Sequence, residues 1–419
     1  MSFGGERRQA MLATLIPLFD EKMSVCAYSV FARKDNHFLN PELEGGARYD
    51  GAGTVHELEV VSSMGMAMLS GGKEVFVPVN QFSVFAEISL QCTVPANKVV
   101  LLMDNSITPE PQYVKRVREL KMQGYKLAMR KLPISSFEPY KEILNQCDYI
   151  LLNHSKIDIE KAKIYFGQVY PNIKLCAVNV DTQEQYDTLR SHGGYDLYEG
   201  GFFRMPVCES ETEVNPLKIN YIELLNVVNA PDYDLTDAAD VIGKDPALVI
   251  SLLEMVNRIA INSEITSIRH AAAMLGQKEL KRWINTAVTK ELCADKPSEI
   301  TRLVMIRAKF AENLAECFEM AMQAQELFIM GLFSVIDIML GMTMEEALAM
   351  VVVPKKVKQA LLDNEGEFAP VLNFIKRYED ADWTEVSRLM VLGNLSMTKV
   401  YEAYLSALRW YRDLFPKER

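Results

Sequence analysis

Side chains that could bind a metal or act as nucleophiles are few and widely spaced in this sequence. None of the five histidines is followed by Asp, and only His270 lies in the C-terminal half. A metal site built from His and carboxylates requires several of these side chains close together. The sequence therefore gives no sign of a His–Asp metal site, and we interpret His270 as a hydrogen-bonded surface or core residue.

The cysteines and glycines also lack a catalytic pattern. No Cys-x-x-Cys pair occurs among the seven cysteines, at positions 26, 92, 147, 176, 208, 293 and 317. Most lie in apolar runs, which favours buried, reduced thiols over a redox or metal role. Gly71-Gly72-Lys73 lacks the spacing of a phosphate-binding loop and precedes a strand-like run, so a turn is expected there. We expect no cofactor and no metal.

The first half of the chain alternates between short apolar runs and helical segments. The apolar runs are typical of parallel strands buried on both faces, and they occupy residues 75–79, 99–103, 126–129, 149–152 and 173–178. A helical segment over 111–123 has one apolar face and ends at Gly124, which suits the residue after a helix. This alternation predicts α/β units that close into a (β/α)-barrel of TIM-like type over residues 1–206.

The second half has a helical period throughout. Residues 207–216 are acidic and polar and end at Pro216, which predicts a linker. Beyond it, apolar residues recur every three to four positions, and Asp245-Pro246 is a typical helix start. We therefore expect an all-helical domain over residues 217–419.

The overall composition limits the classes of partner. At 419 residues, the chain is long enough for two domains. The formal net charge of 45 − 56 = −11 disfavours nucleic acid as a partner, because an acidic chain gains little from releasing counterions. The longest apolar stretch, 327–342, is too short and too interrupted to span a bilayer, and residues 1–10 lack an apolar signal-peptide core. The expected location is cytoplasmic.

Several segments carry family resemblances. Residues 147–153 and 197–206 resemble barrel landmarks of the EAL family, whose members hydrolyse cyclic di-GMP. In the second half, the resemblance is to an HDOD domain, through residues 244–248, 253–257, 266–268 and 274–276. The resemblance implies an EAL–HDOD signalling protein from bacteria, with an EAL-like barrel followed by an all-helical HDOD domain.

EAL hydrolases use two divalent cations held by carboxylates and one Asn at the ends of barrel strands. By this resemblance, the signature Glu is replaced here by Ser29, and a metal-binding Glu by Leu102. The paired aspartates of the family correspond to Arg130 and Lys131. Positive charge at these positions would repel the cations, and the two side chains could instead occupy the metal positions and pair with Glu199.

The remaining catalytic and metal-binding positions of the family are also occupied by other residues here. The Lys and Asp of the following strand correspond to Leu151 and Asn153, and the late Glu corresponds to Val178. The Gln of the closing motif is Glu199. The resemblance thus implies a degenerate phosphodiesterase, a pseudoenzyme without a catalytic residue set.

Two family residues are retained, Arg33 and Asn80. They could still contact a nucleotide, with Arg33 on a phosphate, or could make only structural hydrogen bonds. The leading interpretation is a non-catalytic signalling scaffold that binds protein partners through residues 217–419, linked by the resemblance to motility or biofilm control. The alternative is a cyclic di-GMP receptor that binds without hydrolysis; an active phosphodiesterase is disfavoured. Homo-oligomer formation is left open.

Overall fold

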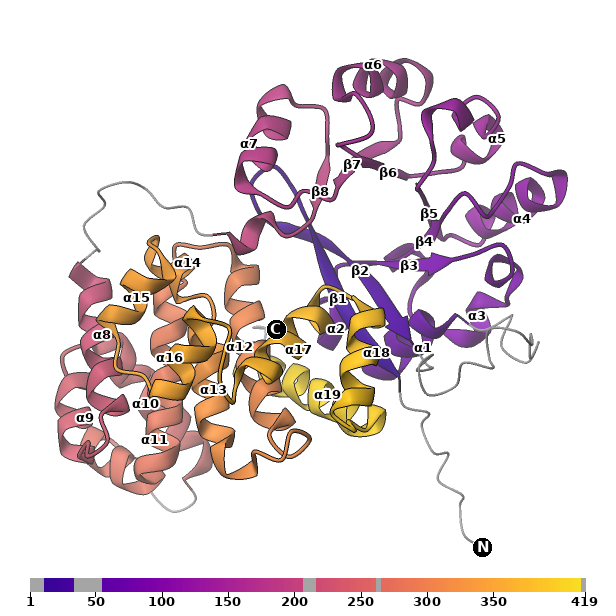
Figure 1. Cartoon of the computed structure of the whole chain (residues 1–419). Coiled ribbons are helices and arrows are strands. Elements are labelled where there is room, and N and C mark those ends of the chain that lie inside the picture. Colours follow the sequence, from indigo (N-terminus) through magenta and orange to yellow (C-terminus); the bar gives the residue numbers. More distant parts are fainter. Residues whose placement is uncertain (1–10, 34–54, 206–215, 261–264, 416–419) are drawn as a thin grey trace, which may run out of the picture. The chain divides into compact units, whose positions relative to one another are not determined.

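A computed structural model describes residues 11–33, 55–205, 216–260 and 265–415 of the chain (Figure 1). The chain forms two compact units. The barrel unit consists of the residues up to Met205 together with residues 316–319 and 374–419, and the helical unit consists of residues 206–315 and 320–373.

Eight strands form a closed barrel in the barrel unit, in sequence order around the ring. The first strand runs antiparallel to both of its neighbours, whereas the other strands are parallel to one another. The strands are β1 (Leu12–Phe19), β2 (Val25–Arg33), β3 (Glu74–Val79), β4 (Val99–Met103), β5 (Lys126–Arg130), β6 (Tyr149–Asn153), β7 (Lys174–Val178) and β8 (Leu197–Glu199). The predicted (β/α)-barrel is confirmed, with an antiparallel first strand in addition.

Helices connect the strands and lie around the outside of the barrel (Figure 1). They are α1 (His56–Met64), α2 (Met66–Leu69), α3 (Ile88–Gln91), α4 (Pro111–Met122), α5 (Lys141–Leu144), α6 (Ile159–Val169) and α7 (Gln183–His192). The predicted helix over 111–123 is α4, and Gly124 follows it with a φ of 92° that favours glycine.

The barrel interior is an apolar core. It is filled from the strands by Leu18, Ala27, Phe76, Val100, Leu102, Ala128, Tyr149, Leu151, Cys176 and Leu197. At the end where the parallel strands begin, Lys126 forms an ion pair with Glu74, and the Tyr149 hydroxyl donates to Glu74 Oε2 at 2.8 Å. These side chains fill the barrel as a packed core rather than a channel.

The last helices of the chain belong to the barrel unit. α18 (Trp383–Leu392) and α19 (Met397–Leu414) lie beside the barrel, and α19 contacts β1 and α2 (Figure 1). The hydroxyl of the fully buried Tyr378 accepts a hydrogen bond from Ala13 N at 3.1 Å. Residues 217–419 are helical as expected wherever they are described. They do not form one unit, because the apolar face of α19 packs on the barrel.

The helical unit follows from α8 to the start of α17. Its helices are α8 (Pro216–Asn229), α9 (Leu235–Ile242), α10 (Pro246–Ile259), α11 (Ile268–Leu292), α12 (Ser298–Leu314), α13 (Ala324–Phe333), α14 (Ile336–Leu340), α15 (Met344–Met350), α16 (Lys355–Leu362) and α17 (Ala369–Glu379). Asp245 caps α10 as predicted, accepting from Ala247 N at 2.8 Å. α12 and α13 are in close contact, since a Cβ on Gly331 would lie 2.4 Å from the Cα of Ala308.

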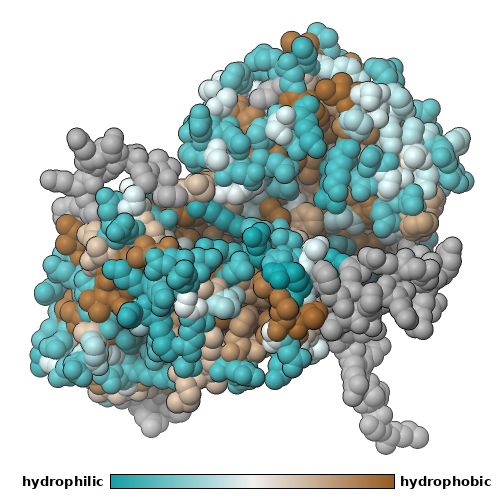
Figure 2. Space-filling model, in the orientation of Figure 1, coloured by the Kyte–Doolittle hydropathy of each residue, from teal (hydrophilic) through white to brown (hydrophobic). Residues whose placement is uncertain are grey.

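On the face of the molecule in Figure 2, hydrophilic side chains predominate, with hydrophobic ones scattered between them. Among the helices that the structure describes, none is both long enough and apolar enough to cross a membrane.

Candidate functional site

The mouth of the barrel is the end where strands β2 to β8 finish, because these strands are parallel. Five residues with an interpretation from the sequence are the last residues of their strands: Arg33, Arg130, Asn153, Val178 and Glu199. In barrels of this kind the functional side chains lie at this end. The topology thus brings the predicted positions to one rim.

Apolar side chains fill three of the positions that would carry polar or metal-binding groups in the EAL family. Leu102 is 1% exposed and Leu151 is 3% exposed, and both belong to the barrel core. Val178 packs against the same core. Hydrocarbon side chains offer no ligand to a cation, and here they close the interior directly below the mouth.

Ser29 and the half-buried Glu199 form a polar pair at the mouth. The fully buried Ser29 hydroxyl donates to Glu199 Oε2 at 2.8 Å. Burial raises the pKa of Glu199, while the hydrogen bond from Ser29 and the charge of Arg130 act in the opposite direction. The carboxyl at the end of β8 is therefore held in a place that favours its neutral form.

Arg130 lies close enough to this pair to influence it. Its positive charge lowers the pKa of both Glu199 and Glu57, although burial raises each of them more. The guanidinium carbon is 5.8 Å from the centre of the Phe31 ring, and the Arg130 Nε is buried without a hydrogen-bond partner among the described residues. Within the described residues, no carboxylate is in ion-pair contact with Arg130. The predicted proximity of Arg130 and Glu199 is thus seen as a charge interaction, not as a salt bridge.

Lys131 does not accompany Arg130. Its side chain is exposed, and its backbone has a φ of 57°, in the left-handed region. Because that conformation turns the chain directly after β5, the two adjacent cations have different surroundings. The exposure of Lys131 lends no support to the hypothesis that both side chains occupy former metal positions, and that hypothesis stays a prediction.

Glu57 is a member of the site that sequence reasoning missed. It lies in the first turn of α1, and its Oε1 accepts a hydrogen bond from Ala32 N at 3.3 Å. Burial raises its pKa to about 7, with the hydrogen bonds and Arg130 opposing the shift. No motif indicated Glu57, because its approach to β2 depends on the path of the chain between β2 and β3.

The two asparagines at the mouth stabilise their own loops. The exposed Asn80 follows β3, and its Oδ1 accepts from Phe82 N at 2.9 Å and Ser83 N at 3.0 Å. Asn153 Oδ1 accepts from Ser155 N at 3.0 Å and from the Ser155 hydroxyl at 2.6 Å. Asn80 therefore makes the structural hydrogen bonds that one interpretation expected. The side chain of Arg33 is half-buried, and a ligand role for Arg33 or Asn80 stays a prediction.

In the portions of the chain covered by the structure, no group of three or more His, Cys, Asp or Glu side chains is placed to hold a metal ion. Of the cysteines, Cys92, Cys147, Cys176 and Cys293 are buried free thiols, Cys317 is half-buried and Cys26 is exposed. His270 is exposed at the start of α11. Cys208 and residues 207–215 of the predicted linker lie outside the described residues.

Comparison with known proteins gives a domain match and two relatives. The model of the HDOD domain matches residues 215–368, nearly the extent of the helical unit and ending before α17. The chain is 28% identical to the uncharacterized protein YuxH of Bacillus subtilis over 410 residues, 95% of this chain and 97% of that protein. It is 26% identical over 332 residues to the cyclic di-GMP phosphodiesterase CdgJ of Vibrio cholerae, covering 78% of this chain and 76% of that protein.

Among solved structures, an EAL domain protein from Listeria monocytogenes aligns with a TM-score of 0.38 at 16% identity. The alignment covers 47% of this chain and 88% of that one. The EAL-like domain protein YdiV aligns with a TM-score of 0.33 at 10% identity, over 46% of this chain and 92% of that one.

Proposed function

We propose that this chain, an EAL–HDOD two-domain protein, is a non-catalytic regulator in cyclic di-GMP signalling that acts by binding protein partners. The packing at the barrel mouth is the observation that carries this proposal. Where a two-metal hydrolase of this family needs ligands, Leu102 is packed into the core and Arg130 places a positive charge. The barrel then serves as a scaffold, and the partner surfaces are assigned to the helices that follow it.

The electrostatics of the mouth support a scaffold. Two-metal catalysis of phosphodiester cleavage needs converging carboxylates that are ionised. Glu199 is half-buried and hydrogen-bonded to Ser29, with a raised pKa, so it is poorly prepared to be a ligand. In a partly buried site, a guanidinium within a few ångströms would oppose the binding of a divalent cation by roughly 4 kcal/mol or more.

Hydrolysis is the function that an experiment must exclude, since one relative is named a cyclic di-GMP phosphodiesterase. A receptor role is the second candidate. It is favoured by Arg130, whose buried Nε has no hydrogen-bond partner at the rim where Arg33 ends β2. Guanidinium groups bind phosphate through paired hydrogen bonds, so two arginines at one rim could hold a phosphodiester without cleaving it.

A calorimetric titration of the full chain with cyclic di-GMP, with and without Mg²⁺, separates these functions when nucleotide integrity is followed by chromatography in the same samples. We expect neither heat nor cleavage. Micromolar binding without cleavage that is lost in Arg33→Ala or Arg130→Ala would establish the receptor instead. The exposed Arg118, which pairs with Glu142 at 2.6 Å, provides a matched control as Arg118→Ala. Mg²⁺-dependent cleavage would contradict both proposals.

A further inference from the structure

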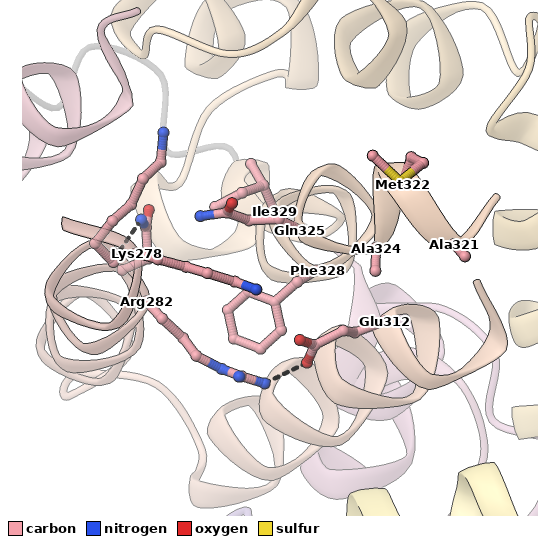
Figure 3. Close-up of a pocket in the computed structure, with 11 residues that line it drawn as sticks. Lys278, Arg282, Glu312, Ala321, Met322, Ala324, Gln325, Phe328 and Ile329 are labelled. Atoms are coloured by element: carbon pink, nitrogen blue, oxygen red, sulfur yellow. Dashed lines mark hydrogen bonds and ion pairs between the residues drawn. The ribbon is translucent and has the colours of Figure 1, made fainter. Parts of the chain in front are cut away.

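The helical unit contains a pocket between α11, α12 and α13, with a cavity of about 130 Å³ (Figure 3). α11 contributes Lys278, Lys281, Arg282 and Asn285 to its wall, and α12 contributes Glu312. The opposite wall is formed from α13 and the short 3-10 turn before it, by Ala321, Met322, Ala324, Gln325, Phe328 and Ile329. Every one of these residues belongs to the helical unit.

The spacing on α11 explains why the cations converge. Lys278, Lys281, Arg282 and Asn285 stand at positions i, i+3, i+4 and i+7, which share one face of a helix. α11 is broken at Gly276, where φ is 72° and ψ is 169°, and the four residues follow this break. The regular helix after the break thus directs three positive side chains to one side.

Negative charge in the pocket offsets only part of this positive charge. Arg282 is in ion-pair contact with Glu312, and the same Glu312 Oε2 accepts from Lys309 Nζ at 2.8 Å. Figure 3 shows Arg282 extended toward Glu312 alongside the ring of Phe328, whose centre is 5.2 Å from the guanidinium carbon. One carboxylate therefore serves two cations before the remaining lysines are counted.

Lys278 and Lys281 have no ion pair among the residues that the structure describes. Lys278 is exposed, whereas Lys281 is half-buried and has its Nζ 5.9 Å from the centre of the Tyr233 ring. Burial lowers the pKa of Lys281, and the charge of Glu326 acts in the opposite direction. A cation that is held partly out of water and has no ion pair among the described residues is costly for a protein to retain, and an anion entering the pocket would compensate for it.

A second polar group has unused hydrogen-bonding capacity. The Nε of Arg282 is buried and has no hydrogen-bond partner in the described part of the chain, which is uncommon for a charged donor. Asn285, by contrast, is fully used, since its Nδ2 donates to Lys281 O at 2.8 Å and its Oδ1 accepts from Asn229 Nδ2 at 3.1 Å. The unsatisfied donors of the pocket are thus its cationic ones.

We propose that this pocket binds the phosphoryl group of a small phosphorylated molecule, with Lys278, Lys281 and Arg282 as its cationic contacts. The volume suits one such group, because a water molecule occupies about 30 Å³ and pockets for whole drug-sized ligands begin at about 300 Å³. The rest of the ligand would extend past Met322, which is 94% exposed at the rim. This site goes beyond the proposed function of the barrel, since it needs no group in the barrel unit.

The test uses the full chain without Mg²⁺ at constant ionic strength. AMP and inorganic pyrophosphate are the phosphorylated probes, and adenosine is the uncharged control. Binding is followed by calorimetry and by the fluorescence of Trp283, the residue next to Arg282 on α11. We expect saturable binding of at least one phosphorylated probe and none of adenosine. The AMP and pyrophosphate arms distinguish a nucleotide from a simpler phosphate.

Variants locate the binding. Lys281→Gln should weaken it at least about tenfold by removing one charge-assisted contact, and Lys281→Arg should largely restore it. Lys244→Gln makes the same charge change on an exposed lysine of the same unit outside the pocket, and should change nothing. Arg130→Ala should also leave the affinity unchanged, which separates this site from the barrel mouth.

Lys281→Gln should fold normally, because it removes a half-buried charge that has no ion pair, and a circular dichroism melt checks this. The proposal is overturned if neither probe binds at millimolar concentration. It is equally overturned if adenosine binds as well as AMP, or if binding is unaffected by Lys278→Gln and Lys281→Gln together.

Discussion

The barrel mouth and the pocket of the helical unit both place an arginine near glutamates, but they differ in how the charge is offset. At the mouth, the charge of Arg130 acts on two half-buried carboxyls, Glu57 and Glu199, and opposes part of the rise in their pKa values. In the pocket, Arg282 shares Glu312 with Lys309, and further lysines line the cavity. The mouth therefore has one arginine beside two carboxyls whose neutral forms are favoured, whereas the pocket has several cations around one carboxylate.

The two regions also differ in what holds them together. The pocket is built from helices that follow one another along the chain, from α11 to α13. The barrel unit instead recruits α18 and α19 from the far end of the sequence, with Tyr378 hydrogen-bonded to Ala13. The barrel unit thus depends on contacts between distant parts of the sequence, whereas the pocket depends on neighbouring helices.

The largest expected effect tests the attachment of the C-terminal helices. Tyr378→Ala should lower the free energy of unfolding of the barrel unit by about 3–5 kcal/mol, because a large, fully buried side chain is removed. Tyr378→Phe should cost about 1–3 kcal/mol, since Ala13 N loses its buried acceptor. Hydrogen exchange resolved by peptide should show lost protection in β1 and unchanged protection in α10. An equal loss of protection in β1 and α10 would contradict the assignment of Tyr378 to the barrel unit alone.

The next prediction asks whether the mouth can be returned to binding a cation. Leu102→Glu should lower the free energy of unfolding by about 2–4 kcal/mol, because a carboxyl would be buried in the barrel core and would largely remain neutral. Leu102→Met is the matched control and should cost less than about 1.5 kcal/mol. Denaturant unfolding with and without Mg²⁺ measures both. If Mg²⁺ stabilised the Leu102→Glu protein selectively, the mouth would have kept the character of a metal site.

The third prediction uses the raised pKa values at the mouth. The pKa of Glu57 is about 7 in the folded protein against an ordinary value of 4.5, so between these values the folded state binds more protons than the unfolded state. The contribution of Glu57 to stability is therefore fully present below about pH 4.5 and is lost as the pH rises through about 7, and a shift of this size corresponds to about 3 kcal/mol. The raised pKa of Glu199 acts with the same sign.

Unfolding of the barrel unit between pH 4.5 and 8, followed by the fluorescence of Trp383 and Trp410, measures this dependence. Glu57→Gln should flatten the profile, because the titrating group is gone. Arg130→Met should move the fall in stability to higher pH, because the charge that lowers both pKa values is removed. A profile identical in Arg130→Met and the natural protein would show that Arg130 does not act on these carboxyls.

The sequence predicts the scaffold of each site better than its chemistry. Short apolar runs such as 99–103 are typical of parallel strands that are buried on both faces. The common direction of the strands then brings Arg130 and Glu199 to one rim. Glu57 could not be found in this way, because it reaches β2 from a helix after a long connection. The left-handed backbone of Lys131, with a φ of 57°, is a local conformation that no sequence pattern signals.

The helical unit shows the same limit. The period of residues 397–414 predicts an amphipathic helix, but period alone does not identify the partner of the apolar face, which is β1 and α2 of the barrel. The spacing of Lys278, Lys281 and Arg282 is visible in the sequence. That Glu312 already serves Lys309 is known only once α12 is placed against α11.

The smallest expected effect tests whether the polar side chains at the mouth serve only hydrogen bonds within the protein. Asn80→Ala should lower the free energy of unfolding by about 1 kcal/mol, because Phe82 N and Ser83 N lose their acceptor. Asn80→Asp keeps an oxygen in that place and should be nearly neutral. If Asn80 is structural, neither change alters a cyclic di-GMP titration beyond its effect on stability. If Asn80 contacts a phosphodiester, Asn80→Asp would abolish binding by charge repulsion while leaving unfolding unchanged. That result would support the receptor function of the barrel over the scaffold function.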